Sequence, residues 1–186
     1  MARVPPIRSR ATVTDGTDGL KVSIPSRKNF WTLAFLPLWL VGWAFGEVSV
    51  ITALLSSDSE APTLFMVTWL IAWTFGGGFA IYIVLWSICG REVVILRADS
   101  LAIRKEVFGV GRSHEYEIGS VRRLRVAAAT YNPFDFKSGL QFWGLGGGVI
   151  AFDYGAGTVR FGSGIEEGEA HDIVEQLSSR HRFADP

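Results

Sequence analysis

Two long apolar segments, Phe30 to Leu55 and Thr63 to Cys89, constrain the fold of this chain more than any other feature of its sequence. The first segment contains one charged residue, Glu47, and the second contains none. A helix rises about 1.5 Å per residue and the apolar core of a bilayer is about 30 Å thick, so each segment is long enough to cross a membrane. The sequence therefore predicts an integral membrane protein with two transmembrane helices, which the short loop Ser56 to Pro62 joins as an antiparallel hairpin.

The distribution of basic residues predicts the orientation of this hairpin. Of the 18 lysines and arginines, six precede the first apolar segment, none lies between the two segments, and twelve follow the second. The connecting loop instead carries Asp58 and Glu60. Because basic flanks remain in the cytoplasm, we expect a multi-pass protein of the inner (cytoplasmic) membrane with both termini on the cytoplasmic side.

The rest of the chain is long enough for one small domain. We expect residues 1–28 to form a tail and a β-hairpin, residues 29–90 the transmembrane hairpin, and residues 91–186 a β domain whose sheet the N-terminal hairpin completes. Short alternating segments bounded by turn residues are typical of antiparallel strands. Such segments are Ala11–Thr14, Leu20–Pro25, Val93–Arg97, Leu101–Phe108, Arg112–Ile118, Val121–Val126, Val149–Tyr154 and Thr158–Phe161.

An amphipathic helix is predicted at Ile165 to Arg180, with Ser163 or Gly164 as its N-cap. Its apolar stripe consists of Ala170, Ile173, Val174 and Leu177. Such a stripe must be buried against a sheet. The expected fold is thus a membrane helical hairpin plus an α+β domain, in which an antiparallel sheet or partial barrel is capped by a C-terminal helix.

This order of elements resembles the pleckstrin-homology-like (PH-like) fold. The stretches IPSRKNFW, GREVVILRADSLAIRKEVFGVGRSHEYEI and GVIAFDYGAGTVRFGSGIEEGEAHDIVEQL are similar to those of uncharacterised bacterial two-span membrane proteins with a PH-like cytoplasmic domain. The resemblance covers nearly the whole chain except residues 127–147. It implies binding of lipids or proteins rather than catalysis, and it transfers no functional residue.

Glycines lie at matching depths in the two apolar segments. Gly42 and Gly46 form a G-x-x-x-G pair in the first, and Gly76, Gly77 and Gly78 are consecutive in the second. Small residues of this kind allow two membrane helices to approach closely, so we expect these glycines to mark the contact between the helices. A ligand or pigment lying against the bare backbone is the functional alternative.

Glu47 is the residue of the apolar segments with the potential for chemistry, since an ionisable group in a membrane usually faces a partner or a water path. Counting about 1.5 Å per residue from Phe30 places Glu47 close to the outer interface. We expect it to reach the outer headgroups or to pair with a partner subunit. The deeper Trp39 and Trp73 are expected to pack between the two helices or against another membrane protein.

Two further sets of residues have the composition of a binding surface. Basic residues near the inner membrane surface suggest contact with anionic headgroups, and they are Arg104, Arg122, Arg123 and Arg125. Interspersed glutamates, which we expect to keep the strands soluble, are Glu92, Glu106, Glu115 and Glu117. The long loop 127–147 is too apolar for a solvated loop, and its aromatic residues are Tyr131, Phe134, Phe136, Phe142 and Trp143. This loop is expected to enter the membrane interface, to bind a protein partner or to cover its own sheet.

The sequence contains little that is typical of catalysis. Its three histidines, His114, His171 and His181, do not have metal-ligand spacing, and no G-x-S-x-G motif occurs. We therefore expect no enzyme, no metal, no cofactor and no nucleic-acid partner. The expected function is that of an accessory or scaffold subunit of a larger membrane complex, whether respiratory, photosynthetic or part of the envelope. A membrane-anchored module that binds or senses anionic lipids is the alternative, and a small transporter component that uses Glu47 is a third reading.

Overall fold

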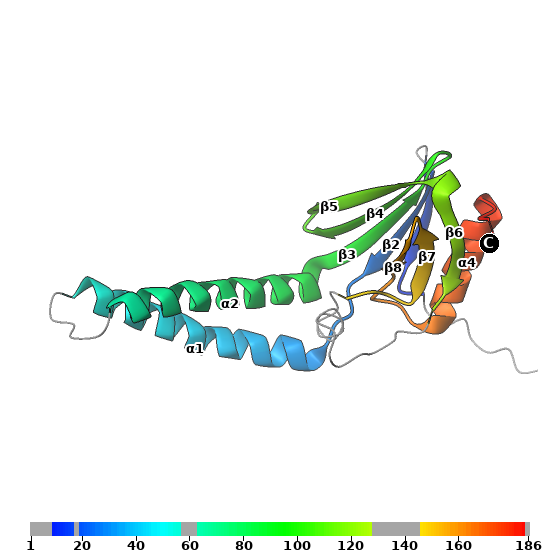
Figure 1. Cartoon of the computed structure of the whole chain (residues 1–186). Helices are drawn as coiled ribbons and strands as arrows, with labels where there is room; N and C mark the ends of the chain where they lie inside the picture. Colours follow the sequence, from blue (N-terminus) through cyan, green and yellow to red (C-terminus); the bar gives the residue numbers. More distant parts are fainter. Residues whose placement is uncertain (1–8, 17–18, 57–62, 128–145, 185–186) are drawn as a thin grey trace, which may run out of the picture. The chain divides into compact units, whose positions relative to one another are not determined.

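The computed structural model describes residues 9–16, 19–56, 63–127 and 146–184 of the 186-residue chain. The chain forms two compact units, one made of residues 28–88 and the other of residues 1–27 together with 89–186. We call them the helical unit and the β domain (Figure 1).

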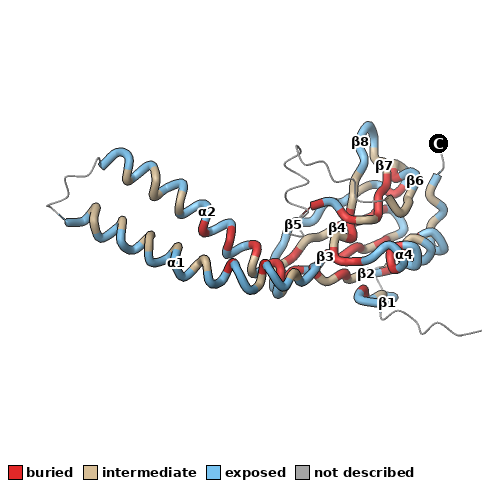
Figure 2. Tube along the Cα trace, turned by 90° about the horizontal axis from the view of Figure 1, so that it is seen from below, coloured by how far each residue is buried: buried red, intermediate tan, exposed pale blue. Residues whose placement is uncertain are grey.

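The helical unit consists of two long helices, α1 (Phe30–Leu55) and α2 (Thr63–Cys89). Asn29 caps the first helix, because its side-chain oxygen accepts a hydrogen bond from the backbone N–H of Trp31 at 3.1 Å. The most apolar windows of both helices have a mean hydropathy of 1.7, yet only 0% and 11% of their residues are buried. Figure 2 shows the contrast with the β domain, where buried residues are concentrated. Within the described part of the chain, both helices are thus long and apolar enough to span a membrane.

The β domain contains two antiparallel sheets. The larger has five strands in the order β1 to β5, and the smaller has three strands, β6 to β8. The strands are β1 (Thr12–Gly16), β2 (Gly19–Pro25), β3 (Gly90–Leu96), β4 (Ser100–Val107), β5 (Val110–Glu117), β6 (Val121–Val126), β7 (Ile150–Tyr154) and β8 (Gly157–Phe161). The short 3-10 helix η1 (Ile118–Ser120) connects β5 to β6.

The N-terminal hairpin is part of the larger sheet. Strand β2 pairs with β3 along its whole length, from Leu20 opposite Leu96 to Pro25 opposite Arg91. These neighbouring strands are separated in sequence by both long helices. The helical unit is therefore an insertion between two adjacent strands of one sheet.

A single hydrophobic core joins the two sheets and the C-terminal helix α4 (Glu167–Arg180). The helix contributes Ala170, Ile173 and Leu177, which pack with residues such as Val94 of the larger sheet and Phe152 of the smaller one. The stripe of the helix is thus buried as its periodicity predicts, although Val174 is only partly buried at the margin of the core.

The start of this helix differs from the sequence prediction. The helix begins at Glu167 rather than Ile165, and its N-cap is Glu166, whose side chain makes no capping hydrogen bond. Ser163 lies three residues before this N-cap, and its backbone N–H donates to the carboxylate of Glu92 at 3.2 Å. The carbonyl of Gly164 accepts a hydrogen bond from Arg10 at 3.1 Å instead.

Two glutamates expected at the solvated surface are buried instead. Glu92 is 1% exposed and Glu106 is 6% exposed. The carboxylate of Glu92 accepts a hydrogen bond from the backbone N–H of Gly162 at 2.6 Å and forms an ion pair with Lys105 at 3.0 Å. Glu106 forms ion pairs with Arg91 and Arg104. Burial is tolerated because each carboxylate has charged or hydrogen-bonding partners.

Candidate functional site

The centre of the helical unit is a reciprocal contact between Trp43 of α1 and Trp73 of α2. The indole N–H of Trp43 donates to the backbone carbonyl of Trp73 at 3.0 Å, and the indole N–H of Trp73 donates to the carbonyl of Trp43 at 3.3 Å. The ring of Trp43 lies over Gly77, where an added Cβ would be 2.0 Å from the ring atom Cε2. The ring of Trp73 lies beside Gly46, with a corresponding distance of 3.7 Å. Each helix thus inserts an indole into a space that a glycine of the other leaves open.

The structure divides the five glycines of the predicted helix contact. Gly46 and Gly77 face the opposite helix, and the nearest atoms there belong to tryptophan rings rather than to backbone. An added Cβ at Gly42, Gly76 or Gly78 would meet no heavy atom within 4 Å. Two of the five predicted glycines thus contact the other helix, and each of them contacts an indole ring.

Two more tryptophans extend this contact. Trp69 stacks on Trp73 with ring centroids 4.6 Å apart, and Trp39 lies 6.1 Å from Trp73. Aromatic pairs at such distances add stabilisation beyond the area they bury. The deeper tryptophans of the sequence thus lie together in the helical unit.

Glu47 lies one helical turn beyond Trp43 and faces Thr74. The hydroxyl of Thr74 has two acceptors within reach, Oε1 of Glu47 at 2.5 Å and the backbone carbonyl of Leu70 at 2.8 Å. A hydroxyl has one proton, so it satisfies only one of them at a time. The other carboxylate oxygen of Glu47, Oε2, is buried and has no hydrogen-bond partner among the described residues. Among the described residues of the helical unit, Glu47 is therefore the polar group with a buried side-chain oxygen that lacks a hydrogen-bond partner.

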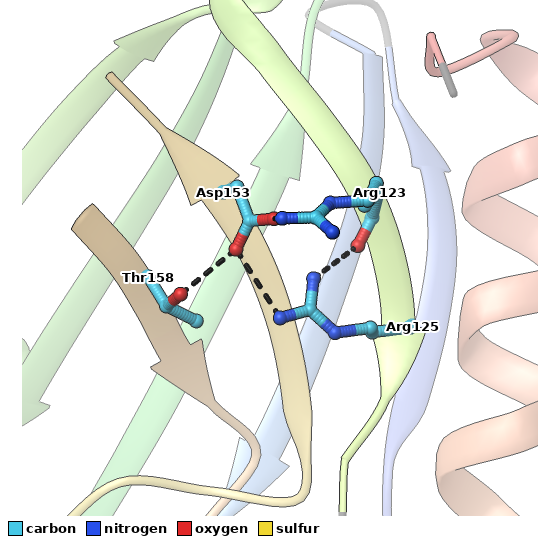
Figure 3. A network of polar contacts seen from close by, with 4 residues as sticks. All are labelled: Arg123, Arg125, Asp153 and Thr158. Atoms are coloured by element: carbon cyan, nitrogen blue, oxygen red, sulfur yellow. Dashed lines mark hydrogen bonds and ion pairs between the residues drawn. The ribbon is translucent and has the colours of Figure 1, made fainter. Parts of the chain in front are cut away.

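A polar network in the smaller sheet centres on Asp153 (Figure 3). Its Oδ1 accepts hydrogen bonds from Thr158 at 2.8 Å and Arg125 at 3.2 Å, and its Oδ2 forms an ion pair with Arg123. A β-bulge between Arg122 and Arg125, with Arg123 at a φ of 49°, allows both arginines to reach one carboxylate. The guanidinium of Arg125 also donates to the carbonyl of Arg123 at 3.0 Å.

This network favours the charged form of Asp153. The hydrogen bond from Arg125, with further contributions from Thr158 and Arg123, lowers the pKa of Asp153 from 3.8 to about 2. A lowered pKa means that protonation favours the unfolded chain, so the stabilisation is complete above about pH 4 and is lost as the pH falls through about 2.

We expect Asp153→Asn to remove this part of the acid sensitivity. The stability of the β domain of the wild-type chain should fall between pH 4 and pH 2 more steeply than that of the variant. Hydrogen exchange of the β6 and β7 amides in the full chain, at several pH values, measures this difference. Parallel pH profiles for the two proteins would contradict it.

The four arginines of the predicted headgroup site do not lie together on one strand. Arg104 is on β4 of the larger sheet, where it pairs with Glu106 at 3.0 Å, and Arg122, Arg123 and Arg125 are on β6 of the smaller one. Two of the β6 arginines share the single carboxylate of Asp153. This network could not be predicted from the sequence, because Asp153 follows the apolar residues Ile150 to Phe152 and the arginines that bind it lie on another strand.

Other candidate residues contribute no site that the structure describes. The aromatic residues Tyr131, Phe134, Phe136, Phe142 and Trp143 lie outside the described residues, so the role of their loop stays a prediction. The histidines are dispersed, with His114 on β5, His171 on α4 and His181 just after it. In residues 9–16, 19–56, 63–127 and 146–184 no three His, Cys, Asp or Glu side chains are arranged to hold a metal ion.

Comparisons with known proteins identify no relative of this chain. No protein family, curated protein or solved structure matches the sequence.

Proposed function

We propose that this chain is a non-enzymatic integral membrane protein that serves as an accessory or scaffold subunit of a larger membrane complex. In this proposal α1 and α2 cross the inner membrane as a hairpin with both termini in the cytoplasm. They hold the β domain, a PH-like module, at the cytoplasmic face. The complex itself is a respiratory, photosynthetic or envelope assembly.

Three observations support the anchor and the module. The two long helices expose apolar side chains over most of their length, which is favourable in lipid and unfavourable in water. The lysines and arginines precede the first long helix or follow the second, and such basic flanks are typical of the cytoplasmic side of a membrane hairpin. Two antiparallel sheets and a C-terminal helix around one core support a PH-like arrangement.

The observation that carries the role of subunit is the incomplete hydrogen bonding of Glu47. An unsatisfied carboxylate oxygen in an apolar environment costs several kcal/mol. Thr74 supplies at most one donor, and Oε2 has none within the described residues. A polar or basic side chain from a partner helix would complete the site, and interhelical hydrogen bonds of this kind contribute about 0.6 to 2 kcal/mol to association in membranes.

We expect Glu47→Leu to release the partner. The tagged chain would be expressed at its native level and purified from its own membranes in mild detergent. A native gel and mass spectrometry would then identify the proteins that accompany it. The wild-type chain should retain a stoichiometric companion, and recovery of that companion should fall about threefold or more in the variant.

Ser49→Ala is the matched control, because the Ser49 hydroxyl already donates to the carbonyl of Phe45 in its own helix at 2.8 Å. This variant should keep the companion. A wild-type chain that is recovered alone or with lipid only would argue against a subunit role, and full recovery of the companion with Glu47→Leu would exclude Glu47 as the contact.

A further inference from the structure

The turn between β4 and β5 has two features that are unusual in a sheet that faces water: a strained backbone conformation and exposed apolar side chains. It consists of Phe108 and Gly109, both with positive φ, at 52° and 81°. Two-residue hairpin loops with two positive φ values favour Asn and Gly, and a bulky side chain at the first position is strained. Phe108 is nevertheless 71% exposed, so packing against the described residues offsets little of this strain. Strain without a local benefit is a feature of functional positions.

Large exposed apolar side chains in the described part of the β domain lie at this turn and directly beside it. Among the large apolar side chains that the structure describes in the β domain, those that are exposed are Phe108 and its neighbour Val110, which is 80% exposed. We call these two residues the hairpin tip. An apolar side chain exposed at the end of a hairpin gains free energy when it enters the interfacial region of a bilayer.

Basic residues surround the hairpin tip. Lys105 lies between Glu92 of β3, with which it forms an ion pair at 3.0 Å, and Arg112 of β5, which is exposed. Arg104 donates to the carbonyl of Gly109 in the turn itself. Together with Arg91 these make four cations, against the two buried carboxylates of Glu92 and Glu106, so two positive charges are in excess. The exposed charges near the tip therefore match a negatively charged surface.

Chain connectivity places this tip at the end of its sheet where the two long helices are joined to it. Helix α2 ends at Cys89, and the next residue, Gly90, is in register with Val107, which in turn is opposite Val110. The backbone N–H of Ser26, four residues before α1, donates to the carbonyl of Gly90 at 2.9 Å. The connection from β2 to α1 and the connection from α2 to β3 thus both lie at the end of the sheet that bears the tip (Figure 1). Since neighbouring strands are about 4.8 Å apart, Val110 is roughly 10 Å across the sheet from the start of β3.

We infer that the hairpin tip inserts Phe108 and Val110 into an anionic bilayer surface, with Arg112 against the headgroups. This inference rests on the proposed membrane anchor. The contact gives the β domain a second attachment to the membrane besides its two covalent connections. It assigns lipid contact to a turn of the larger sheet rather than to the arginines of β6.

Spin labels on the full chain test this inference. The chain, with Cys89→Ser, is placed in bilayers of phosphatidylcholine and phosphatidylglycerol and is labelled at one of three exposed positions: Val41→Cys near the middle of α1, Val110→Cys at the tip, or Glu117→Cys at the far end of β5. Collisions with oxygen report lipid, and collisions with a water-soluble nickel chelate report water. The labels at 41 and 110 should be shielded from nickel, whereas the label at 117 should be accessible.

The three positions separate the possible failures. A label at 41 that is accessible to nickel would overturn the membrane anchor itself. A label at 41 that is shielded, together with a label at 110 as accessible as that at 117, would overturn only the insertion of the tip and would leave it as a surface for a protein partner. Shielding at 110 that is unchanged in phosphatidylcholine alone would overturn the requirement for anionic lipid.

Phe108→Asn distinguishes a lipid contact from a structural role. The asparagine relieves the strained φ and removes the apolar ring, so we expect the β4–β5 amides to exchange more slowly while the inserted fraction of the tip falls about tenfold. Stability and membrane contact thus change in opposite directions. If the variant loses stability, or keeps full shielding at 110, the inference is wrong.

Discussion

Gly77→Ala is expected to destabilise the α1–α2 pair by about 1 to 3 kcal/mol, the range observed when a methyl group is forced into a packed interior. The new Cβ would lie 2.0 Å from the ring of Trp43, so this ring must move. Its N–H then loses the carbonyl of Trp73, which it now reaches at 3.0 Å. The aromatic contacts of Trp73 with Trp39 and Trp69 are disturbed as well.

Unfolding of the full chain in detergent micelles measures this effect. Six of the seven tryptophans lie in α1 and α2, so tryptophan fluorescence reports mainly on the helical unit. Gly76→Ala and Gly78→Ala are matched controls, because the added methyl group meets no heavy atom within 4 Å. They should be neutral or slightly stabilising, since alanine is favoured over glycine in a helix by up to about 1 kcal/mol. If Gly77→Ala behaves like its neighbours, the indole–glycine contact does not hold the helices together.

Glu92→Ala is expected to destabilise the β domain by about 3 kcal/mol or more. The substitution leaves the backbone N–H of Gly162, which is buried, without the acceptor that it reaches at 2.6 Å, and a buried donor without a partner costs about 1 to 3 kcal/mol. It also removes the carboxylate that pairs with Lys105 at 3.0 Å. Glu92→Gln keeps one acceptor oxygen and should be less destabilising than Glu92→Ala.

Hydrogen exchange of the full chain resolves this effect by segment, because amides of β3 and β4 open with the β domain. Glu117→Ala is the control, since Glu117 is exposed and makes no capping hydrogen bond to η1. Its effect should stay within about 0.5 kcal/mol. Equal protection in Glu92→Ala and Glu117→Ala would show that the buried carboxylate is not an anchor of the sheet.

The sequence predicted local structure well, because the relevant signals are local. The predicted ends of the two long helices, Phe30–Leu55 and Thr63–Cys89, agree with the structure, since a continuous apolar run defines them. The strand Val121–Val126 also agrees, and the other strands differ by a few residues at their ends. The antiparallel sheet and the C-terminal helix are confirmed at this level, whereas the PH-like assignment stays a prediction.

The sequence did not predict features that depend on residues distant in the chain. Alternation places Glu92 on the same face of β3 as the core residues Val94 and Leu96, where a carboxylate is not expected. It is tolerated there because Gly162, Ser163 and Lys105 converge on it. Similarly, the spacing of Gly42 and Gly46 puts both on one helix face, but only at Gly46 would an added Cβ have a side chain of the other helix, Trp73, within 4 Å. The division of eight strands into five and three is also a non-local property, because register and pairing are set between segments.

The insertion of two long helices between β2 and β3 fixes an order of events during biosynthesis. The first 27 residues leave the ribosome with the strands of one hairpin, and two strands alone are marginally stable in water. Their partner β3 is synthesised only after both helices. The β domain therefore completes its larger sheet only after both long helices have been synthesised. Until then the edge of β2 that β3 will occupy has no partner strand, and an unpaired edge of this kind can pair with other chains. Folding of the β domain thus depends on the chain on both sides of the helical unit, so a defect that keeps β3 away from β2 would leave the larger sheet incomplete.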